Sequence, residues 1–292
     1  MDILLLLVII TFIWVIIASI TDLKKREVPD WISYSLIAIG VVFSLINAIV
    51  EGDFFLLINP LIGFIVFFII ANLMYHSSQW GGGDAKLLMG FGIVFSSYPN
   101  SLLNVLNPYL GSMPFPIIFL LNIIIFGSVY GILWALMIAL KNKEKSVIEF
   151  KRILSKSKKS RYLITTITLI LLILSFIVSK DLKILFVGFG AMIFILFYLS
   201  LFVKAVENSA MVKKLAVDKL TEGDWVLNKI FINKKLVYSP RASGITKEDI
   251  IRLKKYGKEI REVVVKEGIP FVPSFLISII VSLIFGSVIR FG

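Results

Sequence analysis

The sequence predicts an all-α polytopic membrane protein, with about eight transmembrane helices and a small α+β cytoplasmic domain near the C-terminus. Hydrophobic residues make up 58% of the 292 residues and charged residues only 17%, against about 45–50% and roughly 25% in soluble proteins. The mean hydropathy is +0.93. No soluble core could bury so much apolar surface, so the chain belongs in a membrane.

Eight apolar segments are candidate membrane spans, because a spanning helix needs about 20 mostly apolar residues. The first is not typical of a cleaved signal peptide, since it lacks a basic start and charged Asp22 follows it. Segment 85–98 is the weakest candidate, with 14 residues. The eight segments are 3–20, 32–50, 56–75, 85–98, 115–140, 163–179, 184–203 and 270–289.

The basic residues predict the orientation, because lysine and arginine accumulate in cytoplasmic loops. If the N-terminus is outside, the cytoplasmic loops 21–31 and 141–162 carry three and nine basic residues. The outer loops 51–55 and 99–114 carry none, and 180–183 carries two. We therefore expect a multi-pass protein of the cell membrane with its N-terminus outside. The net charge of +12 then reflects this bias and does not indicate nucleic-acid binding.

The chain divides into four expected regions: a membrane core at 1–98, further transmembrane helices at 99–203, a cytoplasmic domain at 204–269 and a last helix at 270–292. Within the second region, 141–162 is a basic amphipathic connector. Simple cytoplasmic anchoring is its plainer interpretation, and binding of anionic lipid is the alternative.

The cytoplasmic domain contains both strand and helix signals. Trp225–Ile232 and Leu236–Tyr238 are expected strands around a turn at 233–235. A helix is expected from Lys247 to about Val265, begun by Thr246 and Asp249 in a capping pattern.

Metal and thiol chemistry is not expected. Cysteine is absent and His76 is the single histidine. The sequence therefore lacks a disulfide, a thiol nucleophile and the two histidines of a His-Glu-x-x-His metalloprotease. We expect neither a metal nor a cofactor.

Asp22 and Asp84 are the candidate chemical groups, because charge at the edge of a membrane bundle is costly and usually functional. In the counted topology both lie at cytoplasmic ends of helices, at similar depth. Two neighbouring carboxyls share one proton. The ionised member can then take a proton from water while the protonated one polarises a carbonyl. The structural alternatives are an N-cap for Asp84 and an ion pair with the following basic residues for Asp22.

Glycines precede Asp84, in the sequence Gly81-Gly82-Gly83. They would allow a substrate backbone to approach closely or allow a positive φ. Lys86, two residues after Asp84, either extends to the headgroups or stabilises an ionised aspartate.

Both aspartate segments resemble the motifs of one family. Gly81-Gly82-Gly83-Asp84 after a span resembles the Gly-x-Gly-Asp motif of the prepilin peptidase family of membrane aspartic proteases. Asp22, followed by Lys24, Arg26, Val28, Pro29 and Asp30, resembles that family's other aspartate motif. The resemblance is clearest over 10–95. In the tail, 222–225 and 268–273 resemble the C-terminal region of the archaeal branch, which includes preflagellin peptidases.

The resemblance implies an aspartic endopeptidase that removes a short basic leader from type IV pilin-like or archaellin precursors on the cytoplasmic side. Asp22 and Asp84 would be the catalytic pair. Without the cysteine-rich insertion of many bacterial members, methylation of the new N-terminus is not expected. The expected substrate-binding or positioning residues are Lys24, Arg26, Pro29, Gly81, Gly82, Gly83 and Lys86.

Other functions stay open at this point. An intramembrane protease of the presenilin or signal-peptide-peptidase type would carry a Tyr-Asp pair, which this sequence lacks. An ion or proton transporter could use the same two aspartates, although the chain shows no two matching halves. A membrane scaffold that binds a filament motor is a fourth possibility without specific support.

Overall fold

The computed structural model describes residues 2–77, 79–232, 235–241, 244–257 and 259–289. The chain is mostly helical, with a small sheet region towards the C-terminus. Five helical stretches in these residues are long and apolar enough to cross a membrane, at 3–25, 30–51, 54–76, 115–141 and 180–210. The other three predicted segments contain helices of only 13, 17 and 13 residues. The chain is therefore a helical membrane protein, and five of the eight expected spans meet the length criterion.

The chain forms two compact units. The first comprises 1–131, 215–263 and 268–292, and the second comprises 132–214 and 264–267.

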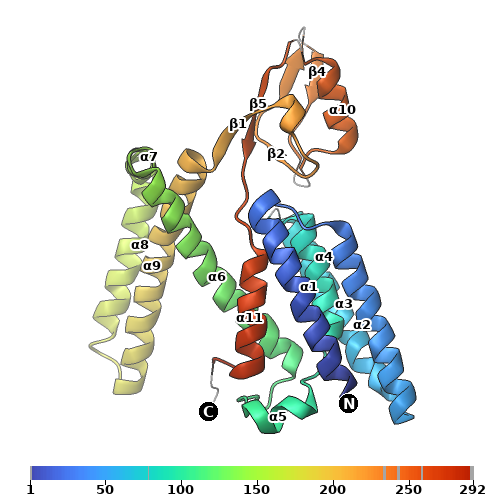
Figure 1. Ribbon diagram of the computed structural model, residues 1–292. Helices are drawn as coiled ribbons and strands as arrows, with labels where there is room; N and C mark the ends of the chain where they lie inside the picture. Colours follow the sequence, from blue (N-terminus) through green and yellow to red (C-terminus); the bar gives the residue numbers. More distant parts are fainter. Residues whose placement is uncertain (1, 78, 233–234, 242–243, 258, 290–292) are drawn as a thin grey trace. The chain divides into compact units, whose positions relative to one another are not determined.

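The first unit contains a helical bundle built from α1 (Ile3–Lys25), α2 (Asp30–Glu51), α3 (Ile58–His76), α4 (Gly82–Val94) and α11 (Val272–Ile284), shown in Figure 1. The first part of α6 (Phe115–Lys141) packs on the same core. Along the chain, the short helix η1 (Phe54–Leu57) precedes α3, and the short helix α5 (Asn100–Leu106) follows α4.

Helix α4 lies inside the bundle, in contact with α1, α2 and α3. Its residues from Leu87 to Val94 are buried except Met89. Glycine makes this close packing possible, because a Cβ at Gly92 would overlap the carbonyl oxygen of Gly63 on α3. The weak signal of segment 85–98 thus has a physical reason: α4 is short and is covered largely by protein.

Aromatic side chains fill the centre of this unit. Phe91 of α4 contacts Phe119 of α6 and Phe275 of α11, with ring centroids 5.8 and 5.4 Å apart. These three rings are fully buried, so residues distant in the sequence share one core.

The sheet region differs from the prediction in two places. Residues 225–232 do not form one strand: β2 (Trp225–Val226) joins β1 (Val212–Ala216) and β5 (Glu262–Lys266) in the order β1-β5-β2, whereas β3 (Ile230–Ile232) pairs antiparallel with β4 (Lys235–Tyr238). The turn residues Asn233 and Lys234 lie outside the described residues.

The expected helix to Val265 was also too long. Helix α10 (Lys247–Lys255) begins at the predicted cap, where the Thr246 hydroxyl accepts the N–H of Asp249. It ends before Gly257, and the β-branched run Val263–Val265 belongs to β5. A short 3-10 helix, η2 (Val217–Lys219), follows β1.

In the second unit, α7 (Lys143–Lys156) and α8 (Lys158–Leu174) follow one another across Ser157 and run antiparallel to α9 (Lys180–Ala210). Ile153 packs with Leu201 near one end, and Leu171 lies against Gly190 further along. At 1.5 Å per residue α9 is about 46 Å long, more than the roughly 30 Å of a hydrocarbon core. The basic connector predicted at 141–162 thus contains α7, which packs along the end of α9.

Candidate active site

Asp22 lies in the last turn of α1 and is only 5% exposed. Its Oδ2 accepts a hydrogen bond of 3.0 Å from the backbone N–H of Val272. Val272 is the first residue of α11, where backbone N–H groups lack partners within the helix. Asp22 is thus a buried carboxylate that accepts a hydrogen bond from a second helix. This differs from the structural alternative, in which Asp22 would be an exposed charge at the end of its own helix.

Asp84 lies in the first turn of α4 and is partly exposed. Its Oδ2 accepts the backbone N–H of Gly81 at 3.1 Å. The N-cap residue is Gly81 rather than Asp84, which occupies the third helical position. Asp84 therefore helps to cap α4 from the third helical position, and this role uses only one of its two carboxyl oxygens.

The helices that carry the two aspartates are in contact, since Asp22 lies on α1 and Asp84 on α4. Helix α4 contacts both α1 and α2, and Val28, between α1 and α2, lies against Gly83. Both aspartates accordingly belong to one end of the bundle, where α1 ends and α4 begins (Figure 1).

The glycines before Asp84 include one position at which two segments of the chain pack closely. A Cβ on Gly83 would lie 2.8 Å from Cβ of Val28, whereas one on Gly82 would meet only Tyr75, at 3.7 Å. Gly81 has a φ of −70°, and Gly82 and Gly83 are helical. A positive φ is therefore not the reason for these glycines.

Residues 9–135 match the type IV leader peptidase family. This region contains both aspartates and all of α2, α3 and α4. The chain is 38% identical over 116 residues to a preflagellin peptidase of Methanococcus maripaludis, a match covering 38% of this chain and 49% of that relative. It is 33% identical over 118 residues to a preflagellin peptidase of Methanocaldococcus jannaschii, covering 39% and 50%.

A prepilin peptidase of Methanothermobacter thermautotrophicus is 24% identical over 155 residues, which are 52% of this chain and 40% of that relative. The chain therefore spans half or less of the length of these curated relatives. No solved structure matches the chain.

The remaining expected residues of the leader-peptidase region have varied placements. Lys24 is exposed, and Pro29 is the residue before the first turn of α2. Lys86 does not turn to Asp84 as one interpretation expected. Its Nζ lies 2.5 Å from Asp30 and over the ring of Tyr34, because it projects towards α2 from the turn that carries Asp84.

Arg26 ends α1 in the left-handed conformation, with φ at 59°. Its Nη1 donates to the carbonyl oxygen of Gly268 at 3.3 Å. His76 is exposed beside Tyr75, which fits a histidine at a helix end.

Trp80, Phe271 and Val272 were not expected at the site. Trp80 directly precedes the three glycines, is 8% exposed and has its ring 5.3 Å from that of Phe271. The only sequence signal was the resemblance of 268–273 to an archaeal C-terminal motif. A backbone N–H donor leaves no signature of its own in the sequence.

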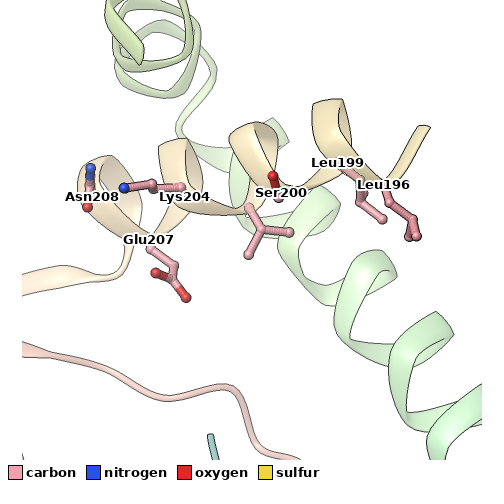
Figure 2. A pocket seen from close by; sticks show the side chains of 7 residues that line it. Leu196, Leu199, Ser200, Lys204, Glu207 and Asn208 are labelled. Carbon is pink, nitrogen blue, oxygen red and sulfur yellow. The ribbon is translucent and has the colours of Figure 1, made fainter. Parts of the chain in front are cut away.

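Within the described ranges, no group of three or more His, Cys, Asp or Glu side chains could hold a metal ion. A shallow hollow of about 500 Å³ lies along the end of α9, in the second unit, as Figure 2 shows. It contains Lys204, Glu207 and Asn208 beside leucines, and neither candidate aspartate.

Proposed function

We propose that this protein is a membrane aspartic endopeptidase that removes the short basic leader from type IV pilin-like or archaellin precursors at the cytoplasmic face. The observation that carries the proposal is the placement of Asp22 and Asp84 at one end of the bundle, where α1 contacts α4 and Val28 lies against Gly83. Both lie in the region matching the type IV leader peptidase family, and relatives of this chain are named preflagellin and prepilin peptidases.

The pair would act on water and on the scissile carbonyl. One proton is shared between the carboxyls, because two adjacent negative charges are unfavourable. The ionised member takes a proton from the attacking water, and the protonated member donates to the carbonyl oxygen. The tetrahedral intermediate then collapses with a proton returned to the leaving amine. The mechanism uses neither a metal nor a covalent intermediate.

The proposed topology places this end of the bundle at the cytoplasmic surface, with the N-terminus outside and about eight membrane-embedded helices. Its support is the excess of basic residues in 21–31 and 141–162. A precursor whose basic leader stays in the cytoplasm would then present its cleavage site at the depth of Asp22 and Asp84.

The test is a cleavage assay with purified protein in detergent and a pilin-like precursor bearing a basic leader. Asp22→Asn and Asp84→Asn should each lower kcat by about 10²–10⁴-fold, because each removes a proton-transfer group. Asp53→Asn is the matched control, since Asp53 is exposed and caps η1 between α2 and α3. Chelator should leave cleavage unchanged.

Cleavage that survives either substitution would remove the aspartates from the mechanism. If no form cleaves, proton or cation flux into proteoliposomes tests the transporter alternative with the same variants. Flux that depends on both aspartates would replace the proposal.

A further inference from the structure

We propose that residues 268–272, which run from the loop after β5 to the first residue of α11, form a positioning element for the catalytic pair. In this element the Val272 N–H orients Asp22, and the Phe271 ring fixes Trp80 beside the glycines that precede Asp84. The inference rests on the proposed function and adds residues that lie outside the family-matching region 9–135.

The contact with Asp22 is specific and buried. The Val272 N–H to Asp22 Oδ2 bond is 3.0 Å long, Val272 is fully buried and Asp22 is 5% exposed. Residues 270 and 273 are both proline, and proline has no N–H to donate. Phe271 and Val272 therefore carry the only N–H groups between the two prolines, and the Val272 N–H can hold one carboxyl oxygen while the other remains for chemistry.

A second contact holds the start of the element. Arg26 follows Asp22 by four residues in the first aspartate motif. Its guanidinium donates a hydrogen bond of 3.3 Å to the carbonyl oxygen of Gly268. The end of α1 is thus attached to the element at Gly268 as well as at Val272. Two attachments restrict rotation of the α1 terminus more than one does.

The third contact reaches the other aspartate motif. The Phe271 ring lies 5.3 Å from Trp80 and 5.3 Å from Phe275, and Trp80 lies 5.6 Å from Phe275. A Cβ on Gly127 of α6 would lie 2.6 Å from Cζ of Phe271, so the ring has no space to move towards α6. The residue before Gly81 is therefore fixed by the same five-residue element that holds Asp22.

Phe271→Ala tests the element without touching either aspartate. It should lower kcat for precursor cleavage by about tenfold or more, because the two carboxyls lose their alignment. KM should change by less than about threefold, because substrate binding is not affected. Phe271→Leu, which keeps most of the apolar volume, should recover part of kcat.

Phe119→Ala is the matched control. Phe119 is a fully buried ring of the same core, packed on Phe67, Phe91 and Phe95. It should lower the unfolding temperature as Phe271→Ala does, yet leave kcat within about twofold below that temperature. Equal loss of kcat in both variants would reduce Phe271 to a packing role and overturn the inference.

The Val272 N–H is tested by replacing the 271–272 amide with an ester, using the α-hydroxy acid of valine. This change deletes one donor and keeps the side chain. Because the deleted hydrogen bond has a charged acceptor, kcat should fall by about tenfold or more. An unchanged kcat would overturn the orienting role of Val272.

The two proposals fail in distinguishable ways. A wild-type protein that cleaves no precursor contradicts the proposed function, and this inference with it. A wild type that cleaves, together with Phe271→Ala and ester variants that cleave equally well, contradicts the positioning element alone.

Discussion

Each candidate carboxylate accepts one backbone N–H, but the donors come from different places. Gly81, the donor to Asp84, is the N-cap of the same helix, three residues earlier. Val272, the donor to Asp22, lies 250 residues further along the chain. The geometry at Asp84 is therefore local, whereas that at Asp22 depends on the packing of α11 against α1.

A shared proton predicts a bell-shaped pH dependence of kcat/KM. Below the acid limb both carboxyls are protonated and none can accept a proton from water. Above the alkaline limb both are ionised and none can donate to the carbonyl. Cleavage rates measured across the pH range in which the protein stays folded should fall on both sides of a maximum.

Asp53→Asn should reproduce the wild-type profile. A profile with one limb only would argue against a pair that shares a proton, and in favour of one acting carboxylate.

Gly83→Ala and Gly82→Ala form a matched pair within one motif. The added Cβ at 83 would lie 2.8 Å from Val28, while that at 82 would have 3.7 Å to Tyr75. Overpacking costs about 1–3 kcal/mol, so Gly83→Ala should lower both the unfolding temperature and cleavage. Gly82→Ala should change neither greatly.

Thermal unfolding in detergent and the cleavage assay give the two readouts. Adding Val28→Gly to Gly83→Ala should restore activity, because it removes the Val28 Cβ that the new methyl group would meet. If the double variant is no better than Gly83→Ala, the contact with Val28 is not what the glycine serves.

At the scale of helices, α3 and α4 touch through their backbones. Gly92→Ala would place a methyl group on the Gly63 carbonyl, a backbone atom that cannot rotate away. We expect a loss of about 1–3 kcal/mol in stability, seen as a lower unfolding temperature. In Gly131→Ala, the added Cβ would meet nothing within 4 Å, so this helical variant should be neutral or more stable by up to about 1 kcal/mol. Equal unfolding temperatures for the two variants would contradict the close packing.

Hydropathy predicted where the helices lie, but not how long each is or what covers it. All eight apolar segments contain helix, yet α4 and α11 have only 13 residues each, and protein packing covers much of their surface. The residues after Lys255 were expected to stay helical, and strand pairing with β1 and β2 prevailed over that local preference.

The sequence indicates Asp22 and Asp84 as candidate groups, because charge at the edge of a membrane bundle is costly and usually functional. Lys86 was harder, since a cation can pair with several acids, and its partner Asp30 depends on how α2 packs on α4. The contact of Val272 with Asp22 could not be predicted from residue types. It depends on a backbone donor and on which helix end the fold brings to α1.

At the scale of the whole molecule, the region that resembles leader peptidases is less than half of the chain. The rest includes α7, α8 and α9 of the second unit, as well as α11, which supplies the donor to Asp22. Helix α7 carries much of the basic excess, and Glu149, which Arg152 contacts at 2.6 Å, is one of its two acids. The Arg152 guanidinium lowers the pKa of the Glu149 carboxyl, so this acid stays ionised at neutral pH and keeps its ion pair with Arg152.

That basic excess leads to a prediction about orientation. The short loops assigned to the cytoplasm hold twelve basic residues, three in 21–31 and nine in 141–162, against two in the outer loops. Because the chain has no cysteine, single cysteines can be introduced without background. Glu51→Cys and Lys145→Cys replace exposed side chains at the end of α2 and in α7.

A membrane-impermeant maleimide should label the Glu51→Cys variant in intact cells, and the Lys145→Cys variant only after the membrane is opened. Labelling of both from the same side would contradict the counted topology, because 51 and 145 are expected on opposite faces. Reversed labelling would place the aspartates outside the cell, where a leader that stays cytoplasmic could not reach them.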